Sequence, residues 1–257
     1  MATIAIGDIH GNLPALTDVL ARIRREVSGK DTVVFLGDYI DRGPDTKRCV
    51  DAILRFQREV SADVVCLRGN HEDWFLRTSC DYRRHSWLMG MDAFDTITSY
   101  SAEAAHALRE AMSETGLSLY VSRCALPYAP FFDAMPEEHR RFFEDLLPYH
   151  RSVDCVCTHA GMDPNVARLE DQTVNALLWG VVGFPDRYQG TETIVYGHWN
   201  NADVDQRGWP TPRIVGSTIG LDTISHGVLT AVRLPDRLVI QSARHPVSGA
   251  DYEISLS

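Results

Sequence analysis

Hydrophobic positions in the first third of the chain alternate between two spacings. Short β-rich apolar runs at Thr3–Ile6, Thr32–Leu36 and Val64–Leu67 predict three strands bounded by turn residues. Between these runs, Leu13–Val27 and Thr46–Val60 carry apolar residues at helical spacing and predict two amphipathic helices. A strand-helix-strand-helix-strand series of this kind favours parallel strands joined by right-handed crossovers.

The pattern changes between about residues 73 and 150, where helical periodicity dominates. We predict helices at Asp92–Ser99, Ala102–Thr115 and Pro136–Leu147, and one strand-like run at Leu117–Ser122. This stretch is interpreted as a mostly helical cap inserted between core strands. We expect its aromatic residues to form its own core, because large rings are usually buried, although rings of this kind can also stack on a nucleobase. The cap aromatics are Trp74, Phe75, Tyr82, Trp87 and Phe94.

Strand patterns return after the cap, separated by turn residues that favour antiparallel pairing of the later strands. The predicted strands are Val153–Thr158, Thr193–Tyr196, Arg213–Gly220, Gly227–Arg233 and Arg237–Arg244. All elements together predict an α/β fold, a mixed β-sandwich flanked by helices, in a single domain spanning residues 1–257.

Composition narrows the possible functions. The formal net charge of −10 argues against a protein that grips long nucleic acid, although metal ions can still attract phosphate to an acidic site. We expect no membrane span and no secretory signal, because no long apolar stretch and no basic leader stand in the sequence. The six cysteines form no CxxC pair, so we expect no structural zinc site. Free thiols and the absence of an export signal predict a cytoplasmic location. Cys155 and Cys157 are predicted to share one face of a strand.

Side chains that commonly bind metals follow five of the predicted strands. The carboxyl ends of parallel strands are where ligands bind in α/β sheets, and imidazole, carboxylate and amide groups suit Mn, Fe or Zn. One such group alone usually marks a turn, but five at strand ends indicate a metal site. Asp8 and His10 can reach one ion, Asp38 can bridge two, and the others can complete the second. The candidate ligands are Asp8, His10, Asp38, Asn70, His159 and His198.

The segments that carry these groups resemble a known family. Gly7–Gly11, Gly37–Gly43 and Gly69–Glu72, with the later His159–Gly161 and Gly197–His198, resemble the blocks of the phosphoprotein phosphatase family of calcineurin-like metallophosphoesterases. The resemblance covers residues 7 to 198 and is strongest to bacterial members, which include serine/threonine phosphatases and symmetrical diadenosine tetraphosphatases. It implies the calcineurin-like fold.

The resemblance also implies a role for each residue. Asp8, His10 and Asp38 would hold one divalent ion, and Asp38, Asn70, His159 and His198 the other; manganese is expected, with iron or zinc as alternatives. His71, paired with Asp41, would be the general acid, and Arg42 would bind a phosphate oxygen. These roles describe a hydrolase in which a metal-bridging hydroxide attacks phosphate.

The resemblance leaves three interpretations of the function. The leading one is hydrolysis of phosphate monoesters, either phosphoserine or phosphothreonine in proteins or small phosphate esters. The alternative is symmetrical hydrolysis of a dinucleoside polyphosphate. A non-catalytic binding protein on the same fold is the remote third, because such a protein is expected to lose ligands and every position here is filled.

Four positions are less well determined by the sequence. The second phosphate-binding arginine that relatives often carry near a Leu-Leu-Trp segment is absent after Trp179, and Arg187 is the candidate substitute. Glu72 is expected to be a favourable charge at a helix N-terminus, with bracing of the metal ligands as the alternative. Asp222 is expected to give structural support, and Trp199 is a candidate wall of the pocket.

Overall fold

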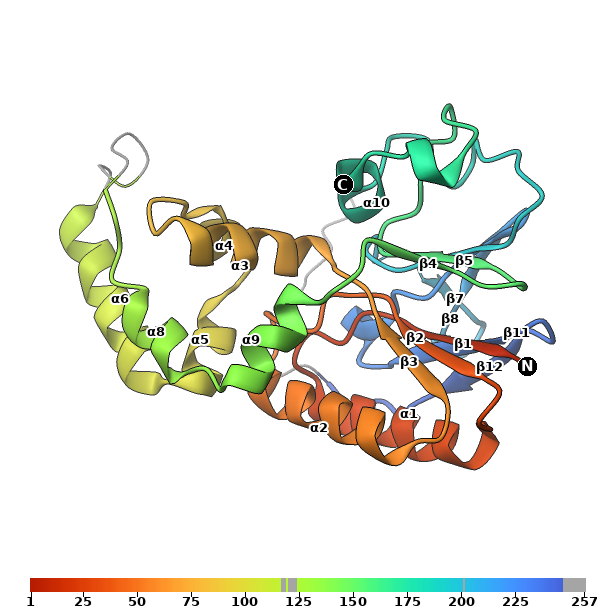
Figure 1. Cartoon of the computed structure of the whole chain (residues 1–257), viewed down its shortest axis with the longest axis horizontal. Coiled ribbons are helices and arrows are strands. Elements are labelled where there is room, and N and C mark those ends of the chain that lie inside the picture. The colour runs from red at the N-terminus through yellow and green to blue at the C-terminus, as the bar shows by residue number, and fades with distance from the viewer. Residues whose placement is uncertain (117–118, 120–123, 201, 247–257) are drawn as a thin grey trace.

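Two five-stranded sheets packed face to face form one half of the protein, at the right in Figure 1. The computed structural model describes residues 1–116, 119, 124–200 and 202–246. Helices cover the outer faces of both sheets, and further helices form a lobe beside them. The predicted mixed β-sandwich flanked by helices is therefore confirmed.

The first sheet has the order β12-β11-β1-β2-β3. Strands β1 (Thr3–Ile6), β2 (Thr32–Phe35) and β3 (Asp63–Cys66) run parallel, as the alternation with helices predicts. Strands β11 (Thr230–Leu234) and β12 (Leu238–Gln241) extend the sheet in antiparallel fashion. The chain thus returns from its far end to pair beside its first strand.

The second sheet has the order β4-β5-β6-β10-β9. Its strands are β4 (Tyr149–Arg151), β5 (Val156–Thr158), β6 (Ile194–Tyr196), β10 (Thr218–Gly220) and β9 (Arg213–Val215). The predicted strand over residues 213–220 is two antiparallel strands, β9 and β10, because Gly216 turns the chain with a φ of 56°. The expectation that the later strands are antiparallel is wrong for β10, which pairs parallel with β6.

Alternation along the strands divides the core into layers. Ile4 and Ile6 face the helices α1 (Leu13–Glu26) and α2 (Thr46–Glu59), whereas Ala5 between them faces the other sheet. Cys155 and Cys157 lie together in that inter-sheet layer with their Sγ atoms 3.7 Å apart, and all six cysteines are free thiols. The outer face of the second sheet packs under α10 (Val174–Trp179).

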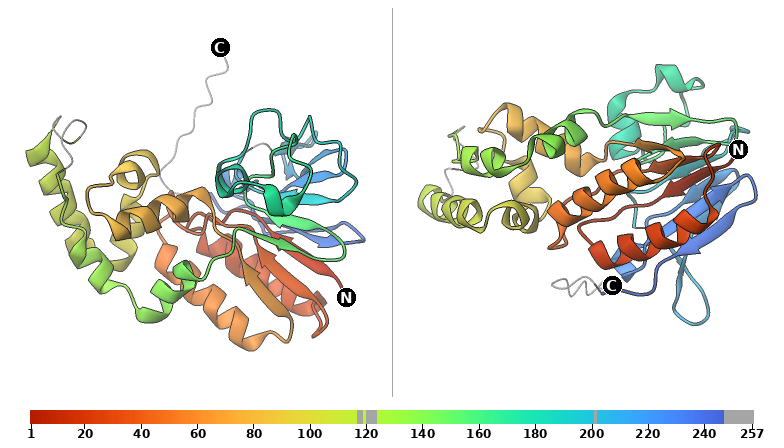
Figure 2. Two further views of the ribbon diagram at one scale, coloured as in Figure 1. Left: turned by 45° about the horizontal axis from the view of Figure 1, so that its top comes forward. Right: turned by 60° about the horizontal axis from the view of Figure 1, so that its bottom comes forward.

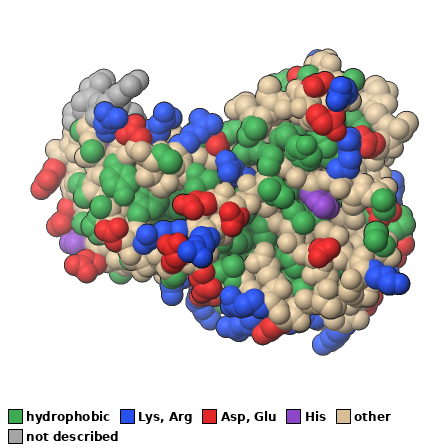
Figure 3. Space-filling model, viewed as in Figure 1, with side chains coloured by type: hydrophobic (Ala, Val, Ile, Leu, Met, Phe, Trp, Pro, Cys, Tyr) green, Lys and Arg blue, Asp and Glu red, His purple; other side chains and the backbone are tan. Residues whose placement is uncertain are grey.

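The helical lobe stands between β3 and β4 in the chain, and Figure 2 shows it to one side of both sheets. It contains α3 (Asn70–Cys80), α4 (Ser86–Gly90), α5 (Phe94–Tyr100), α6 (Ala102–Thr115), α8 (Ala129–Ala134) and α9 (Glu137–Glu144). The space-filling view shows this cap and the sandwich as two lobes with a notch between them (Figure 3).

Aromatic residues fill the centre of the cap, as the burial argument predicts. Phe75 and Trp87 are buried, with ring centroids 5.2 Å apart in an edge-to-face arrangement. Trp74, Tyr82 and Phe94 are partly buried against the same hydrophobic cluster.

Short elements complete the fold: β7 (Asp203–Val204), β8 (Pro210–Thr211) and the 3₁₀ turns η1 (Leu169–Asp171) and η2 (Ile224–His226). The predicted strand-like run at Leu117–Ser122 lies, apart from Leu119, outside the described residues. No helix in the described ranges is both long and apolar enough to cross a membrane.

Candidate metal centre

The loops that follow β1, β2, β3, β5 and β6 bring all six predicted ligands to one edge of the sandwich. Eight non-glycine residues in the described part of the chain have a positive φ, and five of them belong to the predicted site. Such strained backbone persists where the surrounding structure requires it, and it clusters at functional sites. The five are His10, Asp38, Asp41, Arg42 and His198.

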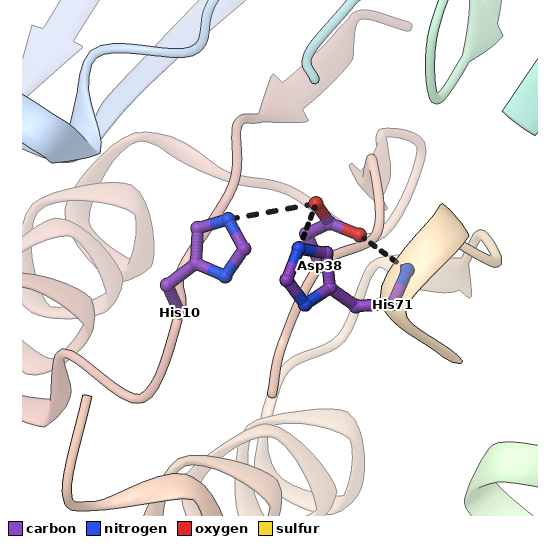
Figure 4. A group of neighbouring side chains, drawn as sticks. All are labelled: His10, Asp38 and His71. Atoms are coloured by element: carbon purple, nitrogen blue, oxygen red, sulfur yellow. Dashed lines mark hydrogen bonds and ion pairs between the residues drawn. The ribbon is translucent and has the colours of Figure 1, made fainter. Parts of the chain in front are cut away.

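Asp38 lies between the predicted ligands, and Figure 4 shows one of its oxygens facing the rings of His10 and His71. Its Oδ2 atom is 3.5 Å from Nε2 of His10 and 3.8 Å from Nε2 of His71. Its Oδ1 atom is 3.3 Å from Nε2 of His159. The two oxygens of one carboxylate thus point to two groups of donors, as a residue that bridges two ions requires.

Asn70, the first residue of α3, gathers the second group. Its side-chain oxygen Oδ1 is 2.9 Å from Nε2 of His159 and 3.0 Å from Nδ1 of His198. Asp38, His159 and His198 have ligand atoms within 4.8 Å of one another, and so do His10, Asp38 and His71. Asp38 is common to both groups.

Hydrogen bonds fix the orientation of two of these imidazoles. The Nδ1 atom of His10 donates to the carbonyl oxygen of Ile40 at 2.9 Å, and Nδ1 of His159 donates to that of Leu36 at 3.0 Å. Since a carbonyl only accepts, each Nδ1 carries the proton and each neutral ring presents a lone pair at Nε2. The Nε2 lone pair of His159 then faces oxygens of Asn70 and Asp38, which repel it unless a cation lies between them.

Two further atoms at the site lack partners. Oδ1 of Asp8 and Nε2 of His10 are buried and make no hydrogen bond within the described structure. The other oxygen of Asp8 accepts a hydrogen bond from the backbone N–H of His198 at 2.9 Å. This bond joins the loop that follows β1 to the loop that follows β6. Burying a hydrogen-bond acceptor without a partner costs free energy of folding. Carboxylate oxygen and imidazole nitrogen atoms are ligands that suit divalent cations such as Mn, Fe or Zn.

The pKa values at the site follow from burial and from the nearby charges. Burial lowers the pKa of His10 and His159 well below the usual value and that of His198 to about 4, so these rings are neutral near pH 7. Burial raises the pKa of Asp38 to about 7, and burial with the charges of Asp222 and Asp38 raises that of Asp8. Divalent cations would relieve this concentration of buried negative charge.

His71 and Asp41 form a direct pair beside the ligands. Nδ1 of His71 lies 2.7 Å from Oδ2 of Asp41, which leaves Nε2 directed towards Asp38. Asp41 also accepts from Nε1 of Trp87 at 2.9 Å and from Oγ1 of Thr96 at 2.7 Å. Both donors belong to the cap, so helices α4 and α5 position a residue of the candidate acid pair.

Glu72 holds the Asp38 loop, contrary to our preferred expectation of a simple helix-terminus charge. It lies in the first turn of α3 but is fully buried, and it accepts four backbone hydrogen bonds. The donors are Asp38 at 2.9 Å, Tyr39 at 2.9 Å, Ile40 at 3.3 Å and Gly69 at 3.0 Å. The alternative expectation, bracing of the metal ligands from outside, describes these contacts.

The two predicted phosphate-binding arginines lie in different surroundings. Arg42 is half-buried, makes no hydrogen bond or ion pair with the described residues, and its charge lowers the pKa of Asp8 and Asp38. Its guanidinium is therefore available to an anion at the ligand cluster. Arg187 is exposed and its stem packs on Gly183, without a described contact to the ligands.

Comparison with known proteins gives the family. The sequence profile of the calcineurin-like phosphoesterases matches residues 1–212. The chain belongs to this family. It is therefore a phosphoesterase, a hydrolase that acts on phosphate esters.

Named relatives of this phosphoesterase differ in substrate. The symmetrical bis(5'-nucleosyl)-tetraphosphatase of Janthinobacterium sp. (strain Marseille) is 26% identical over 275 residues, covering 94% of this chain and 96% of that protein. Serine/threonine-protein phosphatase 1 of Salmonella typhimurium is 38% identical over 104 residues, covering 40% of this chain and 45% of the relative. A crystal structure of a proposed diadenosine tetraphosphatase superposes with a TM-score of 0.60 at 20% identity, covering 93% and 92% of the two chains, and so shows the shared fold.

Sequence reasoning missed two residues that shape this calcineurin-like site, Trp87 and Thr96. Both hydrogen-bond to Asp41 from the cap, and no spacing relates them to the residue they contact. Trp199 is half-buried beside His198, with ring centroids 5.0 Å apart, and its Nε1 donates to the carbonyl of Ala160. The phosphoesterase site therefore draws on the cap as well as on the strand ends.

Proposed function

We propose that this phosphoesterase hydrolyses phosphate monoesters with alkoxide leaving groups, such as phosphoserine, phosphothreonine or small phosphate esters. The supporting observation is the His71–Asp41 pair, 2.7 Å apart, next to the shared carboxylate Asp38. An alkoxide is a poor leaving group, and it departs readily only when a positioned acid gives it a proton.

The ligands divide between two divalent cations, for which we propose manganese, with iron or zinc as alternatives. Asp8, His10 and Asp38 would hold the first cation. When bound, the two cations would supply Lewis acidity, which activates water and neutralises charge on the phosphate. Asp38, Asn70, His159 and His198 would hold the second cation.

The remaining steps belong to the side chains around the ligands. Arg42 would bind a phosphate oxygen through its planar fork and hold the phosphorus for in-line attack by water. As the bond between phosphorus and the leaving oxygen breaks, Nε2 of His71 would give that oxygen its proton. Asp41 would stabilise the protonated imidazole before transfer. Arg187 is proposed as the second phosphate-binding arginine.

A second candidate function is symmetrical hydrolysis of a dinucleoside polyphosphate. The similarity to a symmetrical tetraphosphatase extends over 94% of this chain, whereas that to the serine/threonine phosphatase covers 40%. A nucleotide phosphate leaves more readily than an alkoxide, so this reaction would depend less on His71.

A comparison of substrates distinguishes the two. Metal-stripped protein is given manganese and then either a phosphoserine peptide or diadenosine tetraphosphate, and the nucleotide products are separated. Faster turnover of the peptide supports the monoesterase, whereas faster release of ADP alone supports the symmetrical hydrolase. Activity that does not depend on divalent cations would reject both mechanisms.

We also propose a cytoplasmic location, since six free thiols suit a reducing compartment. The proposed partners are therefore the phosphorylated proteins or small phosphorylated molecules of that compartment.

A further inference from the structure

Asp222 is a buried carboxylate outside the predicted ligand set that lies beside the metal centre. It follows β10 in the second sheet, with 2% of its surface exposed. Its Oδ2 atom accepts a hydrogen bond from the backbone N–H of Asn200 at 2.5 Å, two residues after His198. Its Oδ1 atom is buried without a hydrogen-bond partner in the described structure.

The backbone places Asp222 beside Asp8. Gly7 and Leu221, which precede these two residues, are so close that a Cβ on Gly7 would lie 2.5 Å from the Leu221 carbonyl oxygen. The charge of Asp222 raises the pKa of Asp8, which agrees with this proximity. Asp8 also has a buried oxygen without a partner, so two neighbouring carboxylates each present one unpaired oxygen.

Two buried carboxylates side by side are unfavourable in a protein without bound cations, because each charge loses its hydration and repels the other. Arg42 offsets part of this cost, since its charge lowers the pKa of Asp222 and of Asp8. Asparagine has the same shape and would accept the Asn200 hydrogen bond without the charge. Holding the Asn200 backbone therefore does not by itself require a charged side chain at this position.

We propose that Asp222 is an outer carboxylate of the metal centre, which strengthens cation binding without being one of the six ligands. The Oδ2 atom of Asp222 holds the loop that carries His198 through its hydrogen bond with Asn200. The negative charge of Asp222 adds to that of Asp8 and so increases the attraction for a cation bound by Asp8. Groups that orient ligands from outside typically contribute about 10–100-fold to metal affinity. The inference rests on the proposed cation site.

The test compares Asp222→Ala and Asp222→Asn with wild type by manganese titration calorimetry on metal-stripped protein. We expect D222A to weaken at least one manganese-binding step by about 10–100-fold. D222N keeps an acceptor for Asn200 but loses the charge, and we expect an intermediate loss. Ser225→Ala is the matched control, because the Ser225 hydroxyl bonds the side chain of the same Asn200 and no hydrogen bond joins it to Asp222 in the described structure.

Melting temperatures separate this role from a structural one. Metal-free D222N is expected to melt at or above the wild-type temperature, since a buried unpaired charge is removed, whereas its gain in melting temperature on manganese addition is reduced. A purely structural role predicts the opposite result, a lower melting temperature without metal. D222N also carries the test should D222A fail to fold.

Two results would overturn the inference. The first is a manganese affinity of both D222A and D222N within about threefold of wild type. The second is a loss of manganese affinity in S225A equal to the loss in D222A. Wild-type protein that binds no manganese would instead reject the cation site itself, so the two failures are distinguishable.

Discussion

Asp41 receives three hydrogen bonds, and the one from Nδ1 of His71, at 2.7 Å, links it to the metal centre. The other two come from the cap. Asp41 is fully buried, and burial raises its pKa well above the usual value, although the bonds from Thr96 and Trp87 act in the opposite direction. These two cap bonds therefore offset part of the cost of ionising Asp41, the carboxylate proposed to stabilise a protonated His71.

Replacing the proposed acid tests its role directly. We expect His71→Asn to lower turnover of an alkyl phosphate by about 10²–10⁴-fold, because the leaving alkoxide receives no proton. Turnover of p-nitrophenyl phosphate should fall far less, since nitrophenolate leaves without one. Steady-state kinetics on both substrates, with bound manganese measured in parallel, decide the matter. Equal effects on the two substrates would show that His71 does not act as the acid.

The cap contact can be tested with a matched pair of variants at Thr96. Its hydroxyl accepts from the backbone N–H of Asp41 at 2.7 Å and donates to the carboxylate of the same residue at 2.7 Å. Thr96→Val keeps the shape but loses both bonds to Asp41 and the 3.1 Å bond to the Thr46 hydroxyl, and we expect a loss of about 1–3 kcal/mol in the free energy of unfolding. Alkyl phosphate turnover should fall about tenfold, as one hydrogen bond is removed from the acid pair.

Thr96→Ser retains the hydroxyl and serves as the control for this substitution. It should lie close to wild type in both chemical denaturation and alkyl phosphate kinetics. Identical behaviour of the Val and Ser variants would mean that packing at residue 96, rather than its hydroxyl, matters.

Arg42 is expected to contribute more than Arg187. Arg42→Ala should lower kcat/KM by about 10²–10³-fold, as expected when a donor to the reacting phosphate is removed. Arg42→Lys should recover only part of the loss, because an ammonium lacks the planar fork. Arg187→Ala should have a smaller effect, since that side chain is exposed and water screens its charge. Wild-type kinetics in R187A would leave Arg42 alone in the phosphate-binding role.

Glu72→Gln should weaken the metal centre without touching a ligand. Glu72 accepts from four backbone N–H groups, and glutamine places an NH₂ group where one accepting oxygen stood. We expect manganese affinity to fall by about 10–100-fold, because the Asp38 loop loses its support. Calorimetric titration measures the change, with Glu138→Gln on the cap surface as the control. An unchanged manganese affinity would show that Glu72 does not support the metal centre and acts only as a favourable charge at the helix N-terminus.

Manganese binding should depend on pH through Asp38. Its pKa is raised to about 7, so a cation competes with a proton there, whereas His198, with a pKa of about 4, is already neutral. Affinity is therefore expected to rise as the pH increases through about 7, with at least one proton released per binding event at the lower pH, because the pKa of Asp8 is raised as well. Titrations in buffers of different ionisation enthalpy count the protons. A flat affinity across this range contradicts the prediction.

The sequence alone determined which candidate ligands stand at strand ends. Asp8 and His159 lie within two residues of the end of an apolar run, and such a run predicts a strand. Parallel strands present their carboxyl ends at one edge, so local information was enough to predict which side chains meet. The same reasoning failed for residues 213–220, where one apolar run is divided at Gly216 and its second half pairs parallel with β6. Pairing direction depends on where the chain re-enters the sheet, which no local pattern records.

Only the tertiary structure decided what surrounds the ligands. Thr96 reaches Asp41 across 55 positions, and Asp222 reaches Asn200 from the neighbouring strand end. Glu72 could be either a helix charge or a brace until its four backbone donors were in place. The role of a buried polar group depends on its hydrogen-bond partners. When these partners lie in distant segments of the sequence, only the folded chain shows which of them meet.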